Sequence, residues 1–357
     1  MPEKTLHIPY SRSWITRKDI AAVNTVLRSG KVSQGSITQA FEKGLSRTVG
    51  AEDGGAVGVS SGTAALFLAL RALKIGAGDD VLTPSYICQE VVEAVLATGA
   101  RPVFCDTSHQ WVIAVDNVRN LINKNTRAII VPHLFGIFAQ TTDFKEFGLP
   151  VIEDCSQAFA FAPDWYITGD IATFSFRWSK CFTTGEGGMA ISKDPDLVSK
   201  MRQIRDGELN RPGFRLLAPI SDMASALGLS QLGRYPSCLK HRRIFAQEYR
   251  QSIDRLSTSL LIDYPYDRSM FYRLSIKIPG GWKEHNRAFS EHGIDVNPGI
   301  PYLQHRNFGL PDAGFESSVD LLEQTIVFPL YPNITKAEKK YCIKAVTEVL
   351  ASLLKSP

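Results

Sequence analysis

Apolar residues along the chain occur either at helical spacing or in short continuous runs. Residues 17–30 carry apolar side chains at helical intervals behind Thr16, with Asp19 three positions later, which predicts a first helix that begins with a capping box. From Ala56 onward, strands and helices alternate. The expected strands cover residues 56–60, 80–84, 102–106, 127–132, 150–154, 171–176 and 189–192, and the first helices between them cover 62–73 and 88–98. Continuous apolar runs of this kind predict an α/β fold, in which helices flank a mostly parallel sheet buried on both faces.

The pattern changes at about residue 236. A long helical stretch over 222–249 is interrupted near Pro236, and it is followed by an expected strand over 271–279, a helix over 282–292 and an amphipathic helix over 336–354. This order of elements predicts a large domain over residues 1–235 and a smaller α+β C-terminal domain over residues 236–357.

Charge and composition narrow the class of protein. The net charge of +4 is spread along 357 residues without a basic block, so nucleic acid is not an expected partner. No apolar run approaches the roughly 20 residues that a membrane helix needs, and the N-terminus lacks a signal core, so we expect a cytoplasmic protein that does not bind membranes. The cysteines are scattered and no histidine lies at metal-ligand spacing, which predicts reduced thiols and no metal site.

A possible anion site lies at residues 60–63, with the sequence Ser-Ser-Gly-Thr, between the first strand of the sheet and the helix that follows it. Backbone N–H groups, hydroxyls and the helix dipole all point to one spot there. An ordinary helix cap made by Ser or Thr is the alternative interpretation.

A pair of carboxylates, Glu153 and Asp154, ends the strand over 150–154. Ligands of open α/β sheets bind beyond the carboxyl ends of the strands. A buried carboxylate stays ionised there if it meets a cation or several hydrogen bonds, and a protonated pyridine nitrogen, a salt bridge or a helix cap would each suffice. Gln157 would face the same ligand if a turn follows Asp154.

Lys180 follows an aromatic strand that ends near Ser175, and it precedes a glycine-rich segment over 183–188. Desolvation at the edge of a sheet favours the neutral, nucleophilic form of a lysine amine, which can form a Schiff base. Most lysines are simply solvated. The functional interpretation rests on the convergence of Lys180, Asp154, the Ser175 hydroxyl and the anion site on one sheet edge.

These features, in this order and spacing, resemble the DegT-type family of sugar aminotransferases, which have the aspartate-aminotransferase (type I) fold of enzymes that use pyridoxal 5′-phosphate (PLP). The resemblance covers nearly the whole chain. Matching segments include residues 33–35, 61–66, 76–81, 99–104, 133–136, 153–158, 184–188 and 328–332.

The resemblance implies a role for each candidate residue. Lys180 would be the Schiff-base lysine, Asp154 would pair with the pyridine nitrogen, and Gln157 would lie near the ring hydroxyl. The phosphate would bind at the Ser61 anion site, held by Gly62, Thr63 and Ser175. A helix N-terminus suits the phosphate charge, and Asp154 would keep the ring cationic.

Two positions depart from the pattern of the family. Cys88 stands where many relatives have an aromatic residue that stacks on the ring, with Tyr86 two places earlier. Residues 217–219 (Leu-Ala-Pro) replace a frequent Asn-x-Arg that reaches the cofactor of the neighbouring subunit, and Arg215 is a possible substitute.

The sugar pocket is less clearly marked. His133, Arg177 and residues 302–307 are candidates, with ordinary packing or surface charge as the alternative.

The activity implied is transfer of an amino group from an amino acid, by expectation glutamate, to a keto sugar, by expectation nucleotide-linked. Lys180 would carry the proton between substrate and cofactor, and the enzyme would be a homodimer. Lys180 also argues against the deoxygenating branch of the family, which has histidine at that position.

Three alternatives stay open. The same transamination could act on a cyclitol or another keto compound, or the chain could be a non-catalytic PLP-binding regulator, although no DNA-binding module is visible. A nucleotide-binding Rossmann protein is disfavoured, because the first turn lacks G-x-G-x-x-G.

Overall fold

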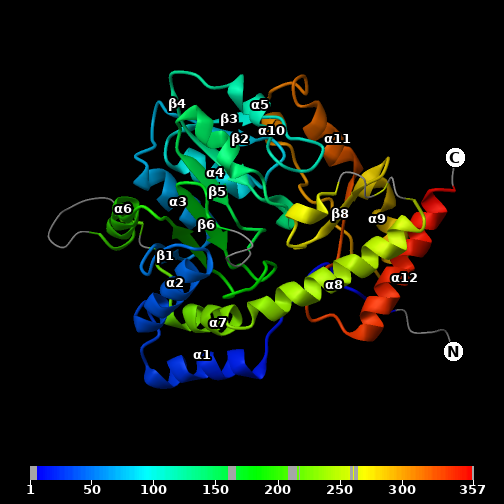
Figure 1. Cartoon of the computed structure of the whole chain (residues 1–357), viewed down its shortest axis with the longest axis horizontal. Helices are drawn as coiled ribbons and strands as arrows, with labels where there is room; N and C mark the ends of the chain where they lie inside the picture. Colours follow the sequence, from blue (N-terminus) through cyan, green and yellow to red (C-terminus); the bar gives the residue numbers. More distant parts are fainter. Residues whose placement is uncertain are drawn as a thin grey trace.

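The N-terminal helices lie beside the main sheet in the computed structural model, which describes residues 6–159, 166–207, 215–216, 218–257, 260 and 264–355 (Figure 1). Helix α1 (Arg17–Ser29) begins with the expected capping box, in which Thr16 and Asp19 satisfy each other's backbone N–H groups. Helix α2 (Ser36–Thr48) was not predicted. Both helices pack against α7 (Asp222–Leu232).

The main sheet has seven strands in the order β1-β7-β6-β5-β4-β2-β3. Only β7 runs antiparallel to its neighbours, so the expected mostly parallel sheet is confirmed. Every strand bound lies within one residue of the predicted one. The strands are β1 (Ala56–Val59), β2 (Asp80–Pro84), β3 (Arg101–Cys105), β4 (Thr126–Pro132), β5 (Val151–Asp154), β6 (Ile171–Ser175) and β7 (Gly188–Ile191).

Apolar side chains cover both faces of this sheet. On one face, Ile130 and Ile152 pack with the helices α3 (Gly62–Ala72), α4 (Gln89–Ala97) and α6 (Pro195–Asp206). On the other face, their neighbours in the strands, Ile129 and Val131, pack with residues from the C-terminal part of the chain. The alternation explains why each strand reads as a continuous apolar run. The short elements α5 (Val115–Arg119), η1 (Leu134–Gly136) and η2 (Thr141–Phe147) lie in the connections.

The C-terminal part contains a second, two-stranded antiparallel sheet formed by β8 (Leu274–Lys277) and β9 (Thr325–Phe328). Helix α8 (Tyr235–Asp254) has Pro236 in its first turn, so the predicted interruption is the junction between α7 and α8. The strand expected over 271–279 is shorter, because Phe271 has a φ of 59°, a left-handed conformation that no strand contains. The remaining elements are η4 (Tyr266–Arg268), α9 (Gly281–Glu291), α10 (Gln304–Asn307), α11 (Glu316–Gln324) and α12 (Lys336–Leu353).

Helix α8 links the two parts, running from the end of α7 to pack against α12 (Figure 1). One apolar cluster joins Leu82 of the main sheet with Leu274 and Val327 of the small sheet. The division into domains at residue 235 therefore stays a prediction. Among the described helices, none combines the length and apolar character that crossing a lipid bilayer requires.

Candidate active site

A cavity lies at the carboxyl edge of the main sheet, where β1, β5 and β6 end. Every residue that the sequence assigned to the cofactor site lines it. The lining consists of Ser61, Gly62, Thr63, Leu66, Cys88, Glu90, Val91, Asp154, Ser156, Gln157, Ser175, Arg177, Lys180 and Glu186. The strand ends meet because Pro132 pairs with Asp154, and Asp154 with Thr173, in parallel register.

The start of α3 lines part of the cavity. The Ser61 hydroxyl caps this helix by accepting a hydrogen bond from the Ala64 N–H (3.1 Å), so the interpretation as a cap is correct for this side chain. The N–H groups of Gly62 and Thr63 lie in the first turn, where a helix offers them no acceptor. A Cβ at position 62 would lie 2.7 Å from Ser175 Cβ. Only glycine allows this close approach. The N–H groups of the first helical turn therefore lie near the Ser175 hydroxyl, and an anion can accept hydrogen bonds from both.

Asp154 also lines the cavity. It ends β5, is 8% exposed, and its Oδ1 accepts a hydrogen bond from the Ser156 N–H (3.0 Å). An ionised carboxylate has about four acceptor sites, so Asp154 can also accept a hydrogen bond from a cationic N–H in the cavity. We call Ser61, Gly62, Thr63, Asp154 and Ser175 the floor of the cavity.

Gln157 has a fixed orientation. Its Oε1 accepts a hydrogen bond from the Phe135 N–H (2.9 Å), and its amide nitrogen therefore faces Cys88 Sγ, 3.8 Å away. Tyr86 is fully buried, with its hydroxyl 3.5 Å from the Ile300 N–H, and does not line the cavity. Tyr86 thus does not supply the missing ring-stacking group.

Cys88 presents a thiol to the cavity in place of an aromatic ring. Burial raises the pKa of this thiol above its ordinary value, and the nearby Lys180 amine opposes the change only in part. The Cys88 side chain is therefore a neutral thiol near pH 7, which offers a polarisable contact and no charge.

Lys180 ends a tight turn that starts at Arg177. The Lys180 N–H donates a hydrogen bond to the Arg177 carbonyl (2.9 Å), and the Ser179 carbonyl between them accepts hydrogen bonds from the Tyr272 hydroxyl (2.7 Å) and from Arg273 Nη2 (3.3 Å). Residues next to the small sheet thus hold the lysine turn in place. Tyr272 and Arg273 could not be predicted from the sequence, because no local signal marks a contact across more than 90 residues.

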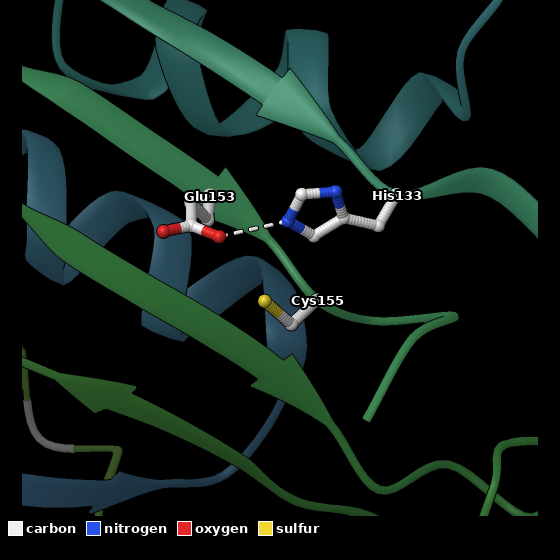
Figure 2. A group of neighbouring side chains, drawn as sticks. All are labelled: His133, Glu153 and Cys155. Carbon is white, nitrogen blue, oxygen red and sulfur yellow. Dashed lines mark hydrogen bonds and ion pairs between the residues drawn. The ribbon is translucent and has the colours of Figure 1, made fainter. Parts of the chain in front are cut away.

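His133, a candidate for the sugar pocket, lies in the interior instead (Figure 2). Its Nε2 is 2.8 Å from Glu153 Oε2, and its Nδ1 accepts a hydrogen bond from the Ala139 N–H. Nδ1 is then unprotonated and Nε2–H is the donor to Glu153. Burial disfavours the charged form of Glu153, but the hydrogen bonds from His133, Gly169 and Thr168 outweigh it and lower the pKa of this carboxyl.

Cys155 lies beside this pair, and the three side chains have ligand atoms close enough for a metal ion (Figure 2). Both nitrogens of His133 are already engaged, however, and burial raises the pKa of the Cys155 thiol well above its ordinary value. The group therefore acts as a packed hydrogen-bonding unit behind Asp154.

The opening of the cavity carries charged side chains, Glu90, Arg177 and Glu186, which we call the mouth. Arg177 Nη1 is 3.4 Å from Glu90 Oε1, and both side chains are about half exposed. Of the sugar-pocket candidates, Arg177 lines the cavity and the segment 302–307 does not. His305 of that segment is fully buried and stacks on Phe315.

Two further expectations concern the neighbouring subunit. Arg215 is exposed and lies against Gly207, and it is not part of the cavity lining. Leu217, in the segment that replaces Asn-x-Arg, lies outside the described residues.

A mostly parallel sheet whose carboxyl edge gathers a helix N-terminus, a buried carboxylate and a lysine defines the type I class of PLP-enzyme folds. The chain belongs to the DegT/DnrJ/EryC1/StrS aminotransferase family, whose sequence model matches residues 14–347. The resemblance found in the sequence is therefore confirmed.

Similar proteins span nearly the same length. The chain is 31% identical to the spore coat polysaccharide biosynthesis protein SpsC of Bacillus subtilis, over 98% of this chain and 99% of SpsC. It is 29% identical to the dTDP-4-dehydro-2,3,6-trideoxy-D-glucose 4-aminotransferase of Saccharopolyspora spinosa, over 90% of this chain and 91% of that enzyme. Among solved structures, NtdA from Bacillus subtilis with bound cofactor PMP has the same fold, with a TM-score of 0.86 and 22% identity over 99% of this chain and 87% of NtdA.

Proposed function

We propose that the chain is a PLP-dependent aminotransferase that moves an amino group from glutamate to a nucleotide-linked keto sugar. One observation carries this proposal: an amine, a buried carboxylate and an anion cradle from separate parts of the chain line a single cavity. Membership of an aminotransferase family supports the reaction type.

The residues present fit PLP as judged by their donor chemistry. The first-turn N–H groups of α3 and the Ser175 hydroxyl suit a phosphate, and the close approach of Gly62 to Ser175 brings them together. Asp154 has acceptor capacity left for a protonated ring nitrogen. The Gln157 amide has its N–H side turned to the cavity, where it can donate to a ring oxygen. NtdA, which shares the fold, was solved with PMP, the aminated form of this cofactor.

PLP, when bound, supplies a reactive aldehyde and an electron-withdrawing ring that makes a Cα–H of the donor acidic. Lys180 would hold the cofactor through its amine, and the free amine would take the proton from the donor Cα. In the second half of the cycle, Lys180 returns a proton to the sugar carbon. The negative charge of Asp154 would favour the protonated form of the ring nitrogen. The hydrogen bonds to the Ser179 carbonyl keep Lys180 oriented.

A sugar acceptor is supported by the relatives, one of which is named as acting on a dTDP-linked dehydro sugar. Glutamate as the donor, a homodimer with its active sites at the subunit interface, and a cytoplasmic location are parts of the proposal that the family resemblance supports. A cyclitol ketone is the alternative acceptor that the experiment below includes.

The test combines spectroscopy with a lysine variant. Purified protein mixed with PLP is expected to develop the absorbance of a lysine-bound cofactor, to lose it when glutamate is added, and to regain it with the correct keto acceptor. Nucleotide-linked keto sugars and cyclitol ketones are screened for this reversal. Lys180→Ala is expected to lower multiple-turnover activity at least about 1000-fold, because the proton carrier is lost. Lys124→Ala, at an exposed lysine outside the cavity, is the matched control.

Sustained turnover by Lys180→Ala with glutamate would show that another group carries the proton. Failure of the wild-type protein to bind PLP would exclude the proposed function altogether.

A further inference from the structure

We propose that Arg177 binds the anionic groups of both substrates in turn, by exchanging its partner Glu90 for a substrate carboxylate or phosphate. This inference rests on the proposed function and concerns the mouth of the same cavity. It makes Arg177 a specificity residue and Glu90 an internal competitor for its charge.

The geometry of the mouth favours exchange. Arg177 Nη1 and Glu90 Oε1 are 3.4 Å apart, and the two side chains are 49% and 47% exposed. A strong ion pair between a guanidinium and a carboxylate has a separation of about 2.7–2.9 Å. Exposed pairs of this kind contribute little to stability, so an incoming anion can replace Glu90 at low cost.

Arg177 lies close to Lys180 along the backbone. Arg177 starts the turn that ends at Lys180, and its carbonyl accepts the Lys180 N–H (2.9 Å). The backbone of Arg177 is also bridged to Gly185 across the loop, so the first residue of the turn is held in place. A ligand bound to the Arg177 guanidinium is thus held by the same turn that carries the proposed proton carrier.

Cys88 shows how closely these groups are gathered. Burial raises the pKa of its thiol, and the charges of Lys180, Glu90, Asp154 and Arg177 all act on it as well. The mouth pair and the proposed catalytic pair line the same cavity as Cys88.

The charge balance of the cavity shows why a cation is needed at the mouth. Among the residues that the structure describes, the charged side chains of its lining are Arg177 and Lys180 against Glu90, Asp154 and Glu186. The proposed function commits Lys180 and Asp154 to the cofactor, which leaves Arg177 facing two carboxylates. An acidic amino acid and a nucleotide-linked sugar both bring negative charge to this opening.

The chemistry of the guanidinium explains how one residue can serve two ligands. Its planar fork forms paired hydrogen bonds with carboxylates and with phosphates alike. Glutamate and a sugar nucleotide occupy the cavity in separate halves of the cycle, so they never compete for Arg177. Between the two halves, Glu90 neutralises the guanidinium.

The experiment uses PLP-loaded protein and two unreactive probes, glutarate for the donor carboxylates and pyrophosphate for the nucleotide phosphates. Dissociation constants are measured by calorimetry and by the absorbance of the bound cofactor. Arg177→Gln is expected to weaken binding of each probe about tenfold, because a charge-assisted hydrogen bond is lost. Glu90→Gln is expected to tighten binding of both probes about threefold, because the competing carboxylate is removed.

Arg119→Gln is the matched control, since Arg119 and Glu146 form an equally exposed ion pair outside the cavity. Its dissociation constants are expected to equal those of the wild-type protein. The cofactor absorbance of each variant shows that its site is intact.

The two probes together test the proposal. Weaker binding of both probes supports it, whereas weaker binding of glutarate alone or of pyrophosphate alone overturns it, because Arg177 would then serve only one substrate. If Arg177→Gln binds cofactor normally and both probes with unchanged affinity, the inference is wrong while the proposed function stands. Absence of cofactor binding in the wild-type protein would remove both.

Discussion

The floor and the mouth of the cavity are built in different ways. Floor residues lie at the ends of buried strands or in the first turn of a helix, so the sheet itself fixes their positions. Mouth residues project from exposed positions and are joined by a loose ion pair. The difference teaches that the fold dictates where a cofactor can be held, whereas side chains near the surface decide what reacts with it.

Replacing Asp154 by Asn is expected to have the largest effect in the floor. The amide retains the shape but cannot hold the charge of a protonated ring nitrogen, so the rate with glutamate should fall about 1000-fold. The measurement is single-turnover loss of the cofactor absorbance. Asp106→Asn is the matched control, because Asp106 is similarly buried just after β3, where it accepts hydrogen bonds from Ser317 and Ser318.

The control separates chemistry from folding. Asp106→Asn is expected to lower stability and to keep the rate per bound cofactor. If Asp154→Asn also keeps its rate, the floor does not work through this carboxylate.

Glu153→Gln is expected to cost about 3 kcal/mol in the free energy of unfolding, because both carboxylate oxygens accept hydrogen bonds, one from His133 and the other from the Thr168 and Gly169 N–H groups, and an amide has only one acceptor oxygen. Glu90→Gln, which breaks the exposed pair at the mouth, should change this free energy by less than about 1 kcal/mol. Denaturant titration measures both. Equal losses for the two variants would contradict the contrast between a buried pair behind the cavity and the exposed pair at the mouth.

The acid dependence of this stability has a definite sign. The pKa of Glu153 in the folded protein lies below its ordinary value of 4.5, so its stabilising effect is complete above about pH 4.5 and is lost as the pH falls through the lowered pKa. The difference between wild type and Glu153→Gln should therefore shrink in acid.

Cys88 lies between floor and mouth, and the effect expected there is the smallest. Because burial raises the pKa of its thiol, alkylation by iodoacetamide should be slow at pH 7 and should speed up only at a pH above the range of an ordinary cysteine. Peptide mapping by mass spectrometry follows the modification, with glutathione as the reference thiol. Rapid labelling of Cys88 at pH 7 would show a thiolate and a more polar cavity than the structure indicates.

The strands of the main sheet could be predicted from the sequence because burial on both faces leaves continuous apolar runs. Helix α2 could not, because its N-terminus is Gly35, which provides no side-chain cap. The cap comes from Asp222, whose Oδ1 accepts hydrogen bonds from the N–H groups of Gly35 and Thr38. A contact across almost 190 residues leaves no local signature.

The floor of the site was predictable for a related reason, since each of its residues ends a recognisable strand or starts a helix. Glu90 was missed, although it lies only two positions after Cys88 at the start of α4. Its proposed role depends on the ion pair with Arg177 at the cavity opening, and no pattern in the sequence indicates that pair. His133 was a candidate for the sugar pocket with ordinary packing as the alternative, and the structure supports packing, because His133 is buried and bonded to Glu153.

The single antiparallel strand, β7, has a consequence for engineering. Since β6 and β7 run in opposite directions, the loop over residues 176–187 leaves and re-enters the sheet at the same edge, and the facing pair Ser175 and Gly188 closes its base. Lys180 and Arg177 therefore lie in one continuous segment of the chain. If Arg177 binds substrate anions as proposed, a graft of this loop from a relative is expected to change donor or acceptor preference without disturbing the order of the strands.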